Sequence, residues 1–282
     1  MRPRGIFLIA KKELMDKIRN RWILALSLLF VVISLTLAYL GGGQMGLGLG
    51  FRDFRATVPA LSPVMAVLVP LVALILGYAT IAGEDESGSL HLLLSLAVTR
   101  TEVLLGKFLG LGAVILATVL VGMSVTGIVI AAAAGTEHGA GYLGFMGITV
   151  LAGLVFLSLS LLLSSLAKRR STAIGGAVFL FFFFLVIFDL LVLGLMIAAG
   201  WEFSLDPSSI QDVPGWAWVL LLADPLETAS LAGYMAVGTT QAFGYSVVAP
   251  PFMTMPLLVF VLLLWMAVPL LLSFVVFHRR DI

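Results

Sequence analysis

Residues 142–199 read YLGFMGITVLAGLVFLSLSLLLSSLAKRRSTAIGGAVFLFFFFLVIFDLLVLGLMIAA, two long apolar runs separated by a short basic turn. The runs, Tyr142 to Ala167 and Thr172 to Ala199, flank Lys168-Arg169-Arg170, and only Asp189 interrupts them with a charge. An α-helix needs roughly 20 apolar residues to cross a hydrocarbon core of about 30 Å. Both runs are long enough, so the stretch predicts two membrane-spanning helices joined by a tight turn.

Four more apolar runs of similar length occur elsewhere in the chain: Trp22 to Leu40, Pro59 to Ala82, Phe108 to Ala134 and Met255 to Phe277. The 282 residues are 61% hydrophobic and only 11% charged, a composition foreign to soluble domains. We therefore predict an all-α polytopic membrane protein, a single domain over residues 1–282. Its six transmembrane helices are expected at 22–40, 59–82, 108–134, 142–167, 172–199 and 255–277.

Lys and Arg fall unevenly on the two sides of these predicted spans. Of the 16 basic residues, only Arg52 and Arg55 lie on one side, and the other side holds both termini and the turn at Lys168. The basic side of a membrane protein is normally cytoplasmic. We expect both termini in the cytoplasm, with the chain crossing the plasma (inner) membrane many times. Membrane lipids explain the basic N-terminus, so no nucleic-acid partner is needed.

The first 21 residues have helical periodicity, with Phe7, Ala10, Leu14 and Ile18 on one stripe. This pattern predicts an amphipathic helix that lies flat on the cytoplasmic headgroups. The alternative is a plain basic flank of the first span.

The extracytoplasmic segment 200–254 is expected to form short helices before the last span. Its stretch Thr228 to Val248 is uncharged but weakly apolar, and inserting it would send Arg279 and Arg280 outside. We interpret it as one or two interfacial or re-entrant helices. Trp216 and Trp218 suit an aromatic belt, and Asp224-Pro225 suits the start of a helix.

The predicted cytoplasmic loop 84–100 begins with Glu84, Asp85 and Glu86 and continues into a leucine-rich stretch. Carboxylates at the start and leucines after it predict a short amphipathic helix. A leucine-rich helix facing the cytosol needs a cover. That cover is either the groove of a partner protein or this chain's own helix ends, and the residues leave both open.

The stretch from Glu84 to Leu96 resembles the coupling helix of the type-2 ABC exporter permeases (the ABC-2 family). Further patches resemble the NosY-type permeases of nitrous-oxide-reductase maturation: residues 10–14, 19–22, 83–86, 105–110, 188–190 and 224–227. One departure is Asp224-Pro225, where Asn-Pro is more usual in that group. The resemblance covers nearly the whole chain.

This resemblance implies a permease subunit that forms a dimeric path with a second copy of itself and works with a separate ATPase, which holds ATP and Mg²⁺. The ATPase-coupling residues it implies are Glu84, Asp85, Glu86, Ser89, Leu90, Leu93 and Leu94. It further implies copper-site maturation, with a periplasmic β-helical protein on the outer segment, at Trp216, Trp218, Asp224 and Glu227. The alternatives are an ABC-2 exporter of another cargo, such as a lipid, drug or small molecule, and a membrane anchor for an extracytoplasmic protein.

Motifs for catalysis are missing from the sequence, which has no GxxxxGK[ST], HExxH or GxSxG. We therefore expect that this chain is not an enzyme and that it binds no cofactor. Asp189 is either a structural acid, paired near the dimer seam or bonded to helix hydroxyls, or a contact for cargo. Met253 and Met255 are either weak candidates for copper ligands or ordinary packing residues.

Overall fold

The computed structural model describes residues 3–19, 21–40, 50–90, 95, 98–201, 213–239, 241–242, 245–246 and 249–279, which are mostly helical. The elements are α1 (Pro3–Ile18), α2 (Arg21–Leu40), α3 (Phe54–Gly77), α4 (Ala82–Glu86), α6 (Arg100–Ala134), α7 (Gly139–Leu166), α8 (Arg170–Phe182), the π-helical turn η1 (Phe183–Ile187), α9 (Phe188–Ala198), α10 (Gly215–Leu221), α11 (Pro225–Ala236), β1 (Gln241–Ala242), β2 (Tyr245–Ser246) and α12 (Met255–Arg279).

The predicted class, an all-α polytopic membrane protein, is confirmed. Five described helical segments are long and apolar enough to cross a membrane: Phe54–Glu86, Arg100–Ala134, Gly139–Leu166, Arg170–Ala198 and Met255–Arg279. A shorter apolar helix, Ser27–Leu40, lies within α2 at the position of the first predicted span. That span as a sixth crossing remains a prediction.

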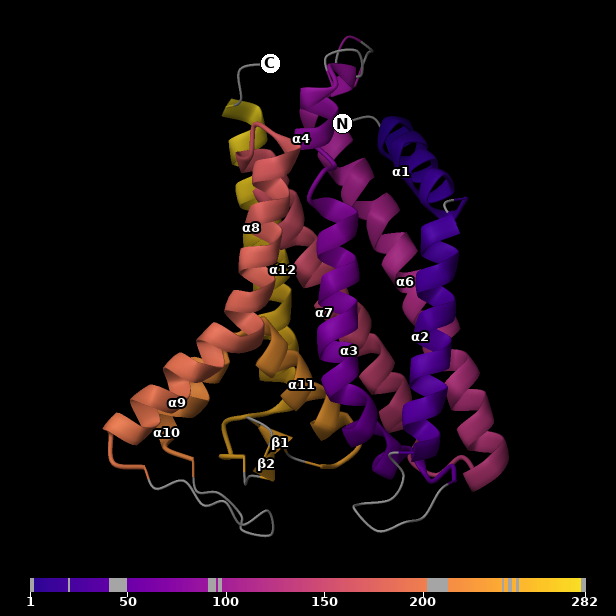
Figure 1. Ribbon diagram of the computed structural model, residues 1–282, viewed down its shortest axis with the longest axis vertical. Coiled ribbons are helices and arrows are strands. Elements are labelled where there is room, and N and C mark those ends of the chain that lie inside the picture. Colours follow the sequence, from indigo (N-terminus) through magenta and orange to yellow (C-terminus); the bar gives the residue numbers. More distant parts are fainter. Residues whose placement is uncertain are drawn as a thin grey trace.

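The two ends of the bundle carry different elements (Figure 1). At one end α1 begins, α12 ends and α4 lies between the long helices; at the opposite end lie α10, α11 and the β1–β2 hairpin. The prediction of cytoplasmic termini assigns the first of these ends to the cytoplasm.

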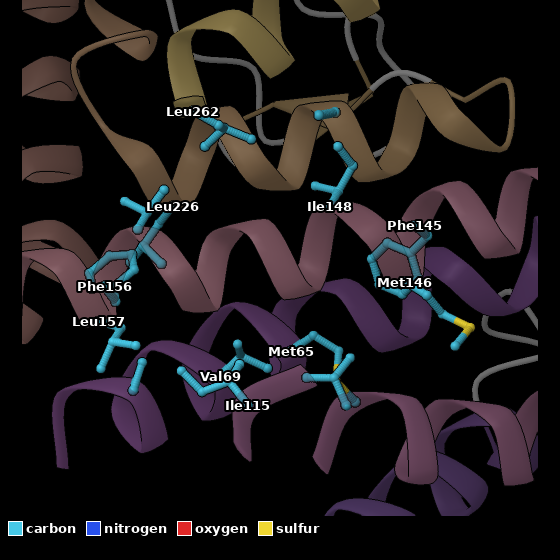
Figure 2. Close-up of a cluster of buried hydrophobic side chains, with 14 of the residues drawn as sticks. Met65, Val69, Ile115, Phe145, Met146, Ile148, Phe156, Leu157, Leu226 and Leu262 are labelled. Carbon is cyan, nitrogen blue, oxygen red and sulfur yellow. The ribbon is translucent and has the colours of Figure 1, made fainter. Parts of the chain in front are cut away.

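Helix α7 forms the centre of the bundle and packs against α3, α6, α11 and α12. Figure 2 shows the buried side chains between them, with Met65 and Val69 of α3 beside Ile115 of α6. Leu262 of α12 belongs to the same buried cluster. This core fixes the frame on which both ends of the bundle are built.

The outer segment departs in part from its prediction. Asp224 caps α11 as expected, because its side chain accepts from the backbone N–H groups of Leu226 and Glu227. Helix α11 ends near Gly238, whose φ of 72° lies in the left-handed region, and the chain then forms a hairpin that pairs Gln241 with Ser246. Of the one or two helices predicted within Thr228 to Val248, the structure shows one, α11, and the described residues beyond it include the paired strands β1 and β2.

The span that runs from Arg170 to Ala198 is interrupted near its middle. Five residues, Phe183–Ile187, form the π-helical turn η1, and beyond it α9 runs away from the bundle axis toward α10 (Figure 1). Val192 and Met196 of α9 bury against Ala217 of α10. The outer half of this span is thus held by the short helix α10.

Candidate functional site

Helix α1 lies directly on the first turns of α6. A Cβ added to Gly106 would lie 2.7 Å from Cβ of Ile9, and one added to Gly110 would lie 2.7 Å from the carbonyl oxygen of Ala10. Such distances require glycine, because any side chain there would separate the two backbones. Gly106 and Gly110 of α6 therefore allow α1 to pack directly on α6, and we call these two residues the glycine seat.

The predicted apolar stripe of α1 is split between two faces. Ala10 and Leu14 are partly buried, and Leu14 packs against the main core. Phe7 and Ile18 point away, with 67% and 45% of their surface exposed. Ile9, Ala10 and Glu13 face α6, so the helix packs on α6 through a face that the predicted stripe only partly includes. An interfacial position for the outer face stays a prediction.

A buried ammonium group joins three elements at this point. Lys107 of α6 is 1% exposed, and its Nζ lies 2.8 Å from Oε1 of Glu13 in α1 and 2.6 Å from Oε1 of Glu84 in α4. A buried cation is tolerated only when it is paired, and here two carboxylates pair with it. We call Glu13, Glu84 and Lys107 the charge junction.

Helix α4 and the residue before it are also hydrogen-bonded to α7 and α8. The hydroxyl oxygen of Ser164 in α7 accepts from the backbone N–H groups of Ile81 and Ala82, at 2.9 and 3.1 Å. Oε2 of Glu86 accepts from the backbone N–H of Arg170, the first residue of α8, at 2.8 Å. These bonds satisfy helix-terminal N–H groups that would otherwise lack partners. Five-residue α4 is thus fixed to α6, α7 and α8 together.

The tip beyond α4 is open to solvent. Glu86, Ser87, Gly88 and Ser89 are exposed, and Gly88 turns the chain with a φ of 72°. The hydroxyls of Ser87 and Ser89 donate to the carbonyl oxygen of Glu84 at 3.1 and 3.2 Å, which keeps the tip compact. We call residues 86–89 the exposed tip.

Leu90 shows which of the two possible covers applies at the start of the leucine-rich stretch. It is 0% exposed and packs with Ile81, Val103, Leu104 and Phe277 of this same chain. The cover of Leu90 is therefore this chain's own helix ends. Arg100 ties the same corner together, since its Nη1 donates to the carbonyl oxygens of Phe277 and His278 at 2.8 and 3.1 Å.

The other predicted coupling residues divide as follows. Glu84 faces inward to Lys107, Asp85 is half-buried, and Glu86 and Ser89 are exposed. Leu93 and Leu94 lie outside the described residues. The acids are therefore not one uniform docking surface, because Glu84 and Glu86 bond to other helices of this chain.

Several predicted outer-segment residues are buried. Trp218 and Asp224 are 2% and 0% exposed, so we correct their assignment to a partner surface: one packs in the core and the other caps α11. Trp216 is 39% exposed and remains available. Met253 is 2% exposed within the core, with Met255 packed beside it, so packing accounts for both methionines.

Sequence reasoning missed the role of Lys107. An ammonium group seven residues into an apolar helix needs a buried anion. Three of the patches quoted above, around Glu13, Glu84 and Lys107, meet at the charge junction. That convergence was the available signal, but the partners lie 23 and 94 residues apart along the chain.

The fold is that of a polytopic membrane protein, and comparisons with known proteins give its family. The model of the "ABC-2 family transporter protein" family matches residues 7–282. The chain belongs to the ABC-2 transporter family, as the permease subunit of an ABC transporter.

Two relatives give the resemblance its detail. The chain is 37% identical over 281 residues to the "Probable ABC transporter permease protein NosY" of Stutzerimonas stutzeri, covering 96% of this chain and 97% of that protein. It is 37% identical over 285 residues to the protein of the same description in Pseudomonas aeruginosa, covering 98% and 99%. The chain is therefore NosY-like over nearly its full length.

Proposed function

We propose that this permease converts ATP hydrolysis in a separate ATPase subunit into movement of its own membrane helices through the charge junction. The observation that carries the proposal is the double pairing of Lys107 with Glu13 and Glu84. An ABC-2 permease implies an ABC ATPase partner. ATP and Mg²⁺ belong to that partner, and no hydrolytic step is assigned to this chain.

The exposed tip is the part that the ATPase contacts in this proposal. Because α4 is bonded to α6, α7 and α8, a push on residues 86–89 reaches three spans at once. Helix α1 moves with them, since Glu13 shares the ammonium group with Glu84. Buried contacts transmit displacement because packed interiors deform little.

The cargo assignment rests on the NosY-like character of the chain. We propose that the permease acts as a dimer in copper-site maturation of nitrous oxide reductase, with a periplasmic β-helical protein on the outer segment near Trp216 and Glu227. Export of another cargo, or anchoring of an extracytoplasmic protein, are the competing functions. Metal-replete reductase in cells that lack the permease would refute the maturation role.

The coupling role is tested with two variants that act at different steps. Ser89→Trp, at the exposed tip, is expected to reduce ATPase co-purification at least tenfold. The neutral triple variant Glu13→Gln, Glu84→Gln, Lys107→Met is expected to keep ATPase binding but to lose transport-dependent stimulation of ATP hydrolysis. Lys12→Met, at an exposed lysine of α1, is the matched control. Full coupling in the triple variant would remove the junction from the pathway, and unchanged binding in Ser89→Trp would move the dock elsewhere.

A further inference from the structure

Two carboxyl groups at the opposite end of the bundle have buried oxygens without hydrogen-bond partners among the described residues. They are Oδ1 of Asp189 in α9 and Oδ2 of Asp224 at the start of α11. Asp224 is 0% exposed. A buried carboxylate oxygen without a donor is costly, so these two oxygens require an explanation. The coupling role proposed above uses neither of them.

A chain of contacts connects the two segments that carry these acids. Nε1 of Trp265 in α12 donates to the carbonyl oxygen of Leu222, two residues before Asp224, at 3.1 Å. The Trp265 ring packs edge-on against Phe184 of η1, with ring centroids 5.6 Å apart, and Phe184 contacts Phe188 at 6.4 Å. Asp189 follows Phe188 directly. Trp265 therefore contacts both the π turn η1 and the turn between α10 and α11. Asp189 lies just after the first of these turns, and Asp224 lies at the end of the second.

Basic groups that would neutralise these acids are missing from the helices packed around them. Glu227 adds a third acid on α11, where Tyr234 is the other titratable side chain. Helix α7 has no charged residue, and α12 has only His278 and Arg279 at its far end. Arg55 of α3 donates to the carbonyl oxygen of Gly238, at the other end of α11. Among these helices, the acids face no cation.

The proton affinity of Asp224 agrees with this geometry. Burial raises the pKa of Asp224 to about 8, although the backbone N–H of Leu226 lowers it. The negative charges of Glu227 and Asp189 raise it further, so the side chains are close enough to interact. Asp224 is therefore mostly a neutral carboxylic acid at neutral pH, with an O–H available for donation.

We propose that Asp189 and Asp224 bind one proton between them, directly or through one bridging water, and that this proton holds α9 against the turn that starts α11. With the proton present, the protonated carboxyl group of one acid donates a hydrogen bond and an oxygen of the other acid accepts it. Both unpartnered oxygens then have a partner. Without it, two carboxylates of like charge interact with no cation supplied by the surrounding helices, and α9 separates from α11. The pair is thus a pH-sensitive latch on the outer half of the fifth predicted span.

The proton is tested by infrared titration of the purified permease in lipid nanodiscs, following the carbonyl band of protonated carboxyl groups. We expect a band in the wild type that titrates near pH 8 and is lost in Asp224→Asn. In Asp189→Asn the apparent proton affinity of Asp224 should fall at least tenfold, because a partner charge is gone. Glu137→Gln, at an exposed acid between α6 and α7, is the matched control and should change neither. An unchanged titration in Asp189→Asn would overturn the shared proton.

The latch itself is tested by hydrogen exchange of the backbone of α9 and α11, corrected for intrinsic rates. Wild-type protection should fall between about pH 6 and pH 9, and Asp224→Asn, whose amide is a permanent donor, should stay protected throughout. Should Asp224→Asn not fold, Asp189→Asn provides the same readout, since it removes the repulsion. Equal loss of protection in the wild type and the variant would overturn the latch, as would protection that follows sodium or calcium concentration instead of pH.

Discussion

Nζ of Lys107 lies 2.6 Å from Oε1 of Glu84, so the acidic loop is bonded to the first turns of α6. Glu84 was expected on a docking surface, but the structure gives it an internal partner. The three neighbouring acids therefore differ in role, and reversing all three charges together would damage the fold before it tested docking. Variants of the exposed tip separate these effects.

Lys107→Met should destabilise the permease by about 3 kcal/mol, because it leaves two largely buried carboxylates without their cation. For a chain of this size the melting temperature should fall by roughly 6–10 °C. The neutral triple variant should recover at least half of the loss, since no unpaired charge remains. Thermal unfolding in detergent measures both, and a melting temperature within a degree of the wild type in Lys107→Met would contradict the pairing.

Gly110→Ala should loosen α1 from α6, because the new Cβ would lie 2.7 Å from the Ala10 carbonyl oxygen and from Cβ of Glu13. Overpacking of this kind costs about 1–3 kcal/mol. Trypsin should then cut at the exposed Lys11 and Lys12 several-fold faster than in the wild type. Gly175→Ala, where a Cβ meets nothing within 4 Å, is the control. Equal cleavage of both variants would mean that the glycine seat is not needed.

Stability should fall as pH rises, and Asp224 should account for the slope. Its folded-state pKa of about 8 exceeds the ordinary 3.8, so the folded chain keeps a proton that the unfolded chain releases. The stabilisation is complete below about pH 4 and is lost as pH rises through 8, by at most about 1.4 kcal/mol per pH unit. Asp224→Asn keeps the helix cap and should flatten the slope, whereas Asp224→Ala should also lose about 1 kcal/mol of capping. A slope that persists in Asp224→Asn would assign it to another group.

A reporter fused after Arg280 should be active only in the cytoplasm. The start of α1 and the end of α12 lie at one end of the bundle, and the basic residues gather on that side of the predicted spans. Paired alkaline-phosphatase and fluorescent-protein fusions measure this location. Phosphatase activity at that position would require an odd number of crossings.

Features set by neighbouring residues were predictable from the sequence. Apolar runs gave the long helices, and Asp224-Pro225 gave the start of α11, because a cap depends on residues two or three positions away. The hairpin after Gly238 was missed, since a short weakly apolar stretch has no decisive periodicity. Alternation alone also could not tell that Trp218 is buried while Trp216 is exposed.

Partners distant along the chain were not predictable. Lys107 and Glu13 are 94 residues apart, and only the seating of α1 on Gly106 and Gly110 brings them together. None of the other five predicted spans contains an acid, Lys, Arg or His that could pair with Asp189. Its neighbour Asp224 comes from the outer segment, which folds back on the end of the bundle.

The π turn Phe183–Ile187 also determines how α9 is rotated about its own axis relative to α8. Each residue of an α-helix turns about 100° around the axis, and a π turn holds roughly one residue more than an α turn. Deleting one residue from the turn would rotate the 11 residues of α9 as a block and swing Asp189 away from α11, while α8 kept its contacts. Insertion or deletion of one residue in this turn would therefore redirect all side chains of the outer half of this span at once, which no single substitution would do.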